Sequence, residues 1–307
     1  MKIGIIGMGW VGSSVAISTL HAGVATELLL HDVREGLAEG EAMDMAHGAP
    51  FYPSASVRAV DSLAPMRDAD AVVIAAGRGG APGESRLALL EHTAGIARTI
   101  GEQLRGMRGL IVVVSNPVDV LVRVVTEASG LPPERVIGTG TMLDTARLRR
   151  MLGEELGLSS RSIHANVVGE HGDSSVLLLD DASIGGVPLR TWPGWDRDRE
   201  PALVHRVRHA AHEIIARKGA TNHAIGLVTA SLLRWMLRGD RRVITVSRMQ
   251  TGALGLDGLA LSLPTVVGRD GATRILEPTM DDAEREALAR SAEVLREAYD
   301  AIGRQPV

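Results

Sequence analysis

The chain has 307 residues, enough for one large or two medium domains. Its hydrophobic fraction of 45% and charged fraction of 23% are typical of a folded α/β protein and exclude a disordered or fibrous one. The formal net charge of -4 argues against a nucleic-acid partner, which normally needs a concentrated basic surface. Without cysteine, the chain has no disulfide, no thiolate zinc site and no cysteine nucleophile.

The amino-terminal segment MKIGIIGMGW has one lysine and a glycine-punctuated apolar stretch instead of a secretory signal. No apolar run along the sequence reaches the roughly 18 residues of a membrane span. We therefore expect a cytoplasmic protein with no membrane partner.

The first half alternates short apolar runs with longer segments of helical periodicity, which is typical of a doubly wound parallel sheet. The expected strands are 3–6, 27–31, 71–75 and 110–114. The expected crossover helices are 11–21, 35–47, 85–104 and 118–128. The rhythm changes near Gly138-Thr139-Gly140, so we place a first domain over residues 1–140.

The second half has an α+β pattern, and we place a second domain over residues 141–307. Its expected helices are 142–156, 201–217, 222–237 and 281–302. Its expected strands are 164–168, 175–178, 242–247 and 259–267. Because no low-complexity linker separates the two halves, we expect them to pack rigidly.

A glycine-rich segment, Gly7-Met8-Gly9-Trp10-Val11-Gly12, follows the first expected strand and opens the first expected helix. The first glycine permits a tight turn, the second lets the backbone approach a pyrophosphate, and the third lets the helix pack closely on the strand. The helix N-terminus also favours phosphate charge. We therefore predict that this segment, Trp10 and Val11 included, binds a dinucleotide in a Rossmann domain.

Asp32 lies 20 residues beyond Gly12, at the end of the second expected strand. A carboxylate there binds both ribose hydroxyls of the adenosine and repels a 2′-phosphate, so NAD is preferred over NADP. Ala76 and Gly77 end another strand at the same sheet edge and should pass close to the cofactor. The alternative, an ordinary turn with Asp32 capping a helix, is disfavoured by the combination of strand, glycines, helix and acid.

Four further segments follow in order, and with the glycine motif they resemble the lactate and malate dehydrogenase family over nearly the whole chain. They are Gly83-Glu84-Ser85-Arg86, Ser115-Asn116-Pro117, Leu143-Asp144-Thr145-Ala146-Arg147 and Gly169-Glu170-His171-Gly172-Asp173-Ser174. The resemblance, closer to the L-lactate dehydrogenases, implies a Rossmann domain followed by an α+β catalytic domain. It also implies a small 2-oxo or 2-hydroxy acid substrate, NAD as cofactor, and a dimer or tetramer.

The resemblance also assigns the catalytic roles. His171 is implied as the proton donor and acceptor, which suits an imidazole whose pKa lies near the operating pH. Asp144 is implied to hold His171 in one tautomer, although the pair is 27 residues apart in sequence and must meet in space. Arg147 follows Asp144 by one helical turn, and its planar fork is implied to clamp the substrate carboxylate. Taken singly, these residues could instead be a loop histidine and a helix-surface ion pair.

The remaining assignments concern the walls of the site. Arg86 is implied to polarise the substrate carbonyl from a mobile loop over residues 78–90, whose closure would exclude water. Asn116 is implied to bind the substrate oxygen or the nicotinamide. Thr221 and Ile225 match positions that line the substrate and nicotinamide pocket.

The family pattern breaks at the position six places before Arg86, where malate dehydrogenases resembling this chain carry Arg and lactate dehydrogenases carry Gln. Gly80 supplies neither group. A second carboxylate would be costly to bury unpaired, so lactate is the leading substrate, with malate, read by Arg78, and larger 2-oxo acids as alternatives. His223 replaces a frequent aromatic of lactate dehydrogenases and leaves the substrate side chain further open.

Two other groups of basic residues have weaker interpretations. Arg149 and His164 match a pair that binds fructose 1,6-bisphosphate between subunits in allosteric bacterial lactate dehydrogenases, so they are a possible anion site. His205, His209 and His212 have helical spacing without a further ligand, and we expect a solvated helix face and no metal site.

Two functions of other classes are disfavoured. A non-enzymatic NAD-binding module would need Gly7, Gly9, Gly12 and Asp32 but not the four catalytic segments. An NAD-dependent glycosidase of related fold would use a metal held partly by cysteine, and the chain has none.

Overall fold

The computed structural model describes residues 1–77 and 85–303. The expected loop positions Arg78 and Gly80 therefore lie outside the described residues, and so does part of the predicted 78–90 loop. The largest element of the fold is a nine-stranded sheet in the order β12-β11-β10-β6-β5-β4-β1-β2-β3. Six of its strands are parallel: β1 (Lys2–Ile6), β2 (Glu27–His31), β3 (Ser56–Ala59), β4 (Ala71–Ile74), β5 (Leu110–Val113) and β6 (Val136–Gly138).

Both faces of the parallel strands other than the edge strand β3 are buried, which explains their continuous apolar runs. In β5, Leu110 and Val112 point into one hydrophobic core, and Ile111 and Val113 point into another. Helices α1 (Trp10–His21) and α2 (Leu37–His47) cover the first core, while α3 (Arg86–Gln103) and α4 (Val118–Ser129) cover the second. The predicted doubly wound Rossmann sheet is thus observed.

The large sheet does not end near residue 140, where the sequence pattern changes, but continues into the second half of the chain. Antiparallel strands β10 (Arg242–Thr251), β11 (Asp257–Gly268) and β12 (Gly271–Ile275) extend the same sheet beyond β6. The junction is the antiparallel pairing of Ser247 with Gly138. Pairing between strands more than 100 residues apart leaves no local pattern in the sequence, so the continuity of the sheet could not be predicted.

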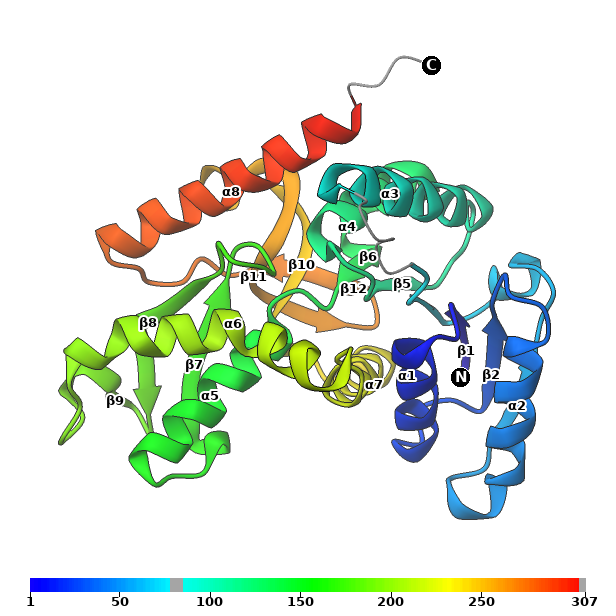
Figure 1. Cartoon of the computed structure of the whole chain (residues 1–307), viewed down its shortest axis with the longest axis horizontal. Helices are drawn as coiled ribbons and strands as arrows, with labels where there is room; N and C mark the ends of the chain where they lie inside the picture. The colour runs from blue at the N-terminus through cyan, green and yellow to red at the C-terminus, as the bar shows by residue number, and fades with distance from the viewer. Residues whose placement is uncertain (78–84, 304–307) are drawn as a thin grey trace.

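Part of the second half forms a lobe with its own core. Helix α5 (Met142–Leu156) and helix α6 (Glu200–Lys218) pack with a three-stranded sheet of β7 (Ile163–Val168), β8 (Val176–Ile184) and β9 (Val187–Pro188). Helix α7 (His223–Arg238) lies beside α1, and α8 (Asp282–Gly303) runs along β11 toward α3 (Figure 1). Among the described residues, no helix is both long and apolar enough to cross a membrane.

Most element bounds agree with the sequence within two residues, but short strands were missed. Strands β3 and β12 carry alternating or polar sequences, SVRA and GATRI, and β6 has only three residues. Strand β8 extends six residues beyond the expected end at 178, to Ile184. These strands depend on sheet pairing instead of on an apolar run of their own.

The antiparallel extension is held to the parallel half at Gly271, which begins β12. Its φ is +95°, and a Cβ there would lie 1.9 Å from the Glu134 carbonyl oxygen. Gly258 on β11 also has a positive φ, +67°, but a Cβ there would have no neighbour within 4 Å. We expect Gly271→Ala to lower the unfolding free energy by about 3 kcal/mol and Gly258→Ala by about 1 kcal/mol, measured by urea denaturation. Equal losses would contradict the close contact at Gly271.

Candidate active site

The glycine-rich loop lies at the carboxyl end of β1, against the end of β4. A Cβ at Gly7, whose φ is +92°, would lie 2.6 Å from the Ala76 Cα, and a Cβ at Gly12 would lie 1.8 Å from the Gly7 carbonyl oxygen. At Gly9 the nearest atom to a Cβ would be 3.9 Å away, so this glycine leaves open space. Packing thus requires the first and third glycines, and the second leaves the backbone open to a ligand.

Asp32 follows β2 and joins the loop to the neighbouring strand. Its Oδ2 accepts the Met8 N–H at 2.7 Å, and its Oδ1 accepts the Arg34 N–H at 2.8 Å. Burial opposes ionisation of Asp32, but the Arg34 and Met8 donors hold the pKa of its carboxyl below the ordinary value. Gly36, not Asp32, is the N-cap of α2, so the helix-cap alternative does not hold. The carboxylate lies at the sheet edge where the adenosine ribose of a dinucleotide binds.

His171, Asp144 and Arg147 meet in space although two different elements carry them. The Nδ1 atom of His171, in the loop between β7 and β8, lies 2.5 Å from Oδ2 of Asp144 on α5. One turn later on α5, Arg147 donates to Oδ1 of Asp144 at 2.8 Å. The side chains of Asp144, Arg147 and His171 are 8%, 13% and 23% exposed, so the imidazole is the most accessible of the three.

The start of α5 is fixed by the junction between β6 and the antiparallel strands. Gly140 has a φ of +46°, and a Cβ there would lie 2.1 Å from the Ser262 hydroxyl of β11. The same hydroxyl accepts the Thr141 N–H at 3.1 Å, and the Thr141 hydroxyl donates to the Val167 carbonyl at 2.5 Å. These contacts set the first turn of α5, which carries Asp144, against the end of β7.

The loop carrying His171 is pinned by hydrogen bonds from α8, α4 and β11. Gly169, with a φ of +84°, exchanges two backbone hydrogen bonds with Ser262. The Glu170 N–H donates to the Ser291 hydroxyl at 2.8 Å, and the Ser174 hydroxyl donates to the Glu170 carboxylate. The His171 N–H donates to the Asp119 carboxylate at 2.7 Å. The imidazole therefore projects from a fixed backbone.

The charges of the site act on one another. Burial alone would lower the pKa of His171, but the Asp144 carboxylate raises it above the ordinary value, with a smaller contribution from Asp119. Burial opposes ionisation of Asp144, yet His171 and Arg147 hold its pKa below the ordinary value. The site therefore favours the protonated imidazole of His171 and the ionised carboxylate of Asp144.

The other predicted residues are placed less completely. Ala76 lies against Gly7 and accepts the Ser115 hydroxyl at 2.6 Å, and Gly77 follows it at the same edge. Asn116 is exposed at the end of β5, three residues before Asp119. Arg86 begins α3, and its side chain lies outside the described residues, as does Gly80.

The segment before α7 faces a different part of the surface. Thr221 in this segment and Ile225 in the first turn of α7 are partly buried, and Asn222 donates to the Ser14 hydroxyl of α1 at 2.9 Å. His223 lines a hollow of about 810 Å³ with the exposed Trp10, between α1, α2 and α7. Thr221 has no hydrogen bond to His171, Asp144 or Arg147 within the described part of the chain.

Arg149 and His164 lie on adjacent elements. Arg149 on α5 donates to the Ala165 carbonyl at 2.9 Å and to the Asn166 side chain at 3.2 Å. Burial, together with nearby Arg242, lowers the pKa of the Arg149 guanidinium. His164 is exposed on β7. The two residues therefore lie near one another, but the protein already occupies two nitrogens of Arg149.

Sequence reasoning missed Asp119 and the serines that hold the His171 loop. Ser262 and Ser291 are buried on elements 91 and 120 residues beyond His171, and nothing local marks them. Asp119 could have been identified from the sequence, because it is an acidic residue in VDVLVRVV, the otherwise mostly apolar start of a helix directly after the Asn116-Pro117 segment. A buried carboxylate beside a predicted binding segment is a candidate functional group.

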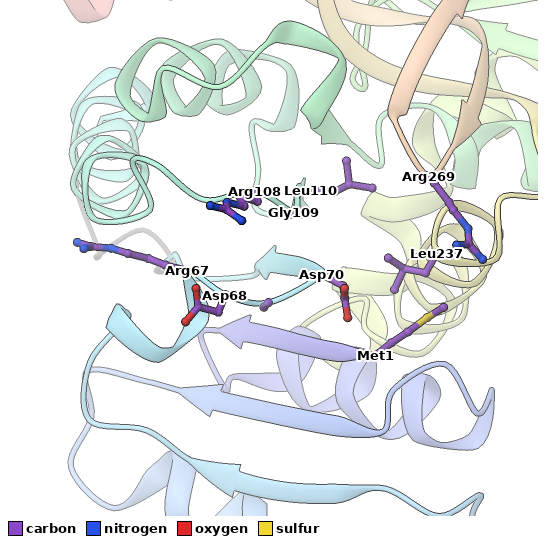
Figure 2. A pocket seen from close by; sticks show the side chains of 10 residues that line it. Met1, Arg67, Asp68, Asp70, Arg108, Gly109, Leu110, Leu237 and Arg269 are labelled. Carbon is purple, nitrogen blue, oxygen red and sulfur yellow. The ribbon is translucent and has the colours of Figure 1, made fainter.

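A separate hollow of about 410 Å³ lies at the opposite, amino edge of the sheet (Figure 2). Met1, Asp70 and Gly109 line it immediately before β1, β4 and β5, and Arg269 lines it from the turn between β11 and β12. The glycine loop and the His171 loop lie at the carboxyl edge. This hollow is therefore not part of the candidate active site.

Comparison with known protein families decides the class of this site. The model described as "lactate/malate dehydrogenase, NAD binding domain" matches residues 1–138, and the model described as "lactate/malate dehydrogenase, alpha/beta C-terminal domain" matches residues 141–304. The chain belongs to the lactate/malate dehydrogenase family. The predicted family, the Rossmann fold, NAD as cofactor and the enzyme class, an NAD-dependent 2-hydroxy acid dehydrogenase, are confirmed.

Individual relatives of the family cover the whole chain. An L-lactate dehydrogenase of Synechococcus sp. (strain JA-3-3Ab) is 42% identical over 98% of this chain and 99% of its own length. One of Kosmotoga olearia is 40% identical over 98% of this chain and 96% of its own length. The crystal structure of a minor L-lactate dehydrogenase from Enterococcus mundtii, in a ligand-bound form, has a TM-score of 0.95 and 34% identity, covering 99% of both chains.

The contacts of Asp32 lead to a prediction on cofactor choice. Asp32→Ser removes the carboxylate that binds ribose hydroxyls and repels a 2′-phosphate, and it leaves the Arg34 guanidinium without its partner. We expect NADH affinity to fall about 10- to 100-fold and NADPH affinity to rise, measured by fluorescence titration. In the double variant Asp32→Ser with Arg34→Leu the gain for NADPH should disappear. Unchanged discrimination in Asp32→Ser would show that another group selects the cofactor.

Proposed function

We propose that this member of the family is an NAD-dependent L-lactate dehydrogenase, which interconverts pyruvate and L-lactate. The observation that carries the proposal is the His171–Asp144–Arg147 cluster, which combines a proton carrier with a carboxylate-binding cation. The named relatives at about 40% identity support lactate as the substrate. Gly80, which has no side chain and so supplies no cation for a second carboxylate, supports lactate over malate as the substrate.

The residues of the chain fit the cofactor. The open backbone at Gly9 suits a pyrophosphate, the helix that begins at Trp10 places its N-terminus there, and Asp32 suits the ribose hydroxyls. NADH, when bound, supplies the hydride that reduces the carbonyl carbon of pyruvate.

The protein supplies the proton and the orientation. In reduction, protonated His171 donates a proton from Nε2 to the carbonyl oxygen, which becomes the hydroxyl of lactate, and in oxidation the neutral imidazole takes it back. Asp144 accepts the Nδ1–H at 2.5 Å and so fixes Nε2 as the atom that exchanges the proton. Arg147 uses one terminal nitrogen on Asp144 and keeps its other donors for the substrate carboxylate.

The other assignments belong to the same proposal. Arg86 polarises the carbonyl, Asn116 binds the substrate oxygen or nicotinamide, and Thr221 lines the pocket. We also propose that the chain works as a homodimer or homotetramer in the cytoplasm. The proximity of Arg149 and His164 supports an anion site for a sugar bisphosphate, tested by its effect on the substrate midpoint and on oligomer size.

The proposed function is tested by comparing substrates and removing the proton carrier. We expect NADH oxidation with pyruvate to exceed that with oxaloacetate and 2-oxoisocaproate in kcat/KM. His171→Ala should lower kcat with pyruvate by about 10²- to 10⁴-fold and leave NADH binding intact. His205→Ala, on the exposed face of α6, is the matched control and should keep full activity. Preference for oxaloacetate, or full turnover in His171→Ala, would refute the proposal.

The raised pKa of His171 predicts opposite pH dependences for the two directions. Pyruvate reduction needs the protonated imidazole, so kcat/KM should fall as pH rises through a pKa above 6.5, and lactate oxidation should rise over the same range. Asp144→Asn removes the main cause of the raised pKa, so the fall in reduction should move to lower pH. Glu154→Gln, which breaks an exposed ion pair with Arg150 on the same helix, should leave both profiles unchanged. Superimposable profiles for Asp144→Asn and wild type would exclude this electrostatic role.

A further inference from the structure

Asp119 is a buried carboxylate that the proposed mechanism has not used. It lies in the first turn of α4, directly beyond the Asn116-Pro117 segment, and is 2% exposed. Ionised carboxylates are rarely buried to this extent unless they are paired or hydrogen-bonded. Burial raises the pKa of Asp119 to about 6, against the opposing effects of the Ser247 hydroxyl and of His171.

Within the described part of the chain, the hydrogen bond that this carboxylate accepts comes from the catalytic loop. Oδ2 of Asp119 accepts the backbone N–H of His171 at 2.7 Å. Oδ1 is fully buried and has no hydrogen bond of normal geometry within the described residues, and the same holds for the Ser247 hydroxyl on β10. The Ser247 hydroxyl is nevertheless close enough to lower the pKa of Asp119. One oxygen of Asp119 thus binds the backbone of His171, and the other lies close to the Ser247 hydroxyl without a hydrogen bond of normal geometry.

The charged groups around His171 come from three segments. Asp144 and Arg147 face it from α5, Asp119 faces it from α4, and Glu170 precedes it in the loop and also acts on Asp119. Arg147 already compensates part of the Asp144 charge through their 2.8 Å ion pair. Asp119 has no cation paired with it among the described side chains. Its charge is therefore a second attraction for the proton on His171.

We propose that Asp119 is a positioning residue for His171, because it fixes the histidine backbone through the His171 N–H and favours the protonated imidazole by its charge. The expected effect on pyruvate reduction rests on the proposed function, whereas the expected effect on the pKa of His171 does not. Asp119 does not touch the substrate or the reacting atoms. It connects α4 of the Rossmann half to the proton carrier, while Asp144 holds the same residue from α5.

Two substitutions separate the hydrogen bond from the charge. Asp119→Asn keeps an oxygen for the His171 N–H and offers an amide to the unpaired Ser247 hydroxyl, so only the charge is lost. Asp119→Ala removes both. We expect Asp119→Asn to move the fall of kcat/KM for pyruvate reduction to lower pH by about one unit, with NADH affinity unchanged. We expect Asp119→Ala to lower kcat about 10- to 100-fold as well, since the loop is no longer fixed.

The matched control is Glu284→Gln. Glu284 on α8 is also a buried carboxylate that accepts backbone N–H groups, from Leu179 and Asp180, but it does not face His171. Its substitution should cost stability without moving the pH profile. A purely structural role of Asp119 would make the Asp119→Asn and Glu284→Gln profiles alike, and that result would overturn the proposal.

A readout without turnover separates this inference from the proposed function. The pKa of His171 is measured by proton NMR titration of its Hε1 resonance, assigned by its loss in His171→Ala, in the absence of substrate. We expect a lower pKa in Asp119→Asn. If Asp119→Asn does not fold, Ser247→Ala serves as a milder substitute. Loss of the Ser247 hydroxyl should raise the pKa of Asp119, reduce its negative charge and so lower the pKa of His171, as Asp119→Asn does. An unchanged His171 titration in the variants that fold overturns the proposal, whereas a wild type inactive on pyruvate overturns only the proposed function.

Discussion

The contact between His171 and Asp144 is the interaction on which the catalytic arrangement depends, and neither of its elements can make it alone. Asp144 is placed by α5, which leaves the large sheet directly after β6, and His171 is placed by a loop that bonds to β11. The two meet because the antiparallel strands close on β6 so tightly that Gly140 admits no side chain beside Ser262. The geometry of the proton carrier is therefore a consequence of a continuous sheet across both halves of the chain.

The same sheet brings the cofactor edge to this pair. Parallel strands end at one edge, so the glycine loop after β1, Ala76 after β4 and Asn116 after β5 lie along it together. Asp119, three residues after Asn116 and in the first turn of α4, reaches the His171 backbone. The cofactor half and the catalytic loop are thus joined by a direct hydrogen bond as well as by packing, and relative motion of the two would displace the imidazole.

The sequence was sufficient for the parts of the fold and the site that have a local signature. The parallel strands are continuous apolar runs, and helices such as α4 and α5 end at glycines, Gly130 and Gly157, in the left-handed conformation. The family motifs similarly identified His171 and Asp144 as partners. The tertiary contacts could not be predicted. They are the pairing of Ser247 with Gly138 and the contacts that serine and aspartate side chains make with the His171 loop. These contacts join residues far apart in the sequence, with no periodic pattern to mark them. The substrate-selecting position Gly80 lies outside the described residues and stays a prediction.

The electrostatic balance at His171 links substrate binding to proton retention. Burial disfavours the imidazolium, and Arg147 repels it, so the protonated state depends on Asp144 and, more weakly, on Asp119. In the proposed function, a substrate carboxylate bound by Arg147 places a negative charge next to that cation. Its repulsion of His171 then falls, and because these side chains are mostly buried, the interaction is screened less than at the surface. A monocarboxylate 2-oxo acid therefore favours the protonated histidine that its own reduction needs, whereas after oxidation the departure of pyruvate favours release of the proton that His171 took from lactate.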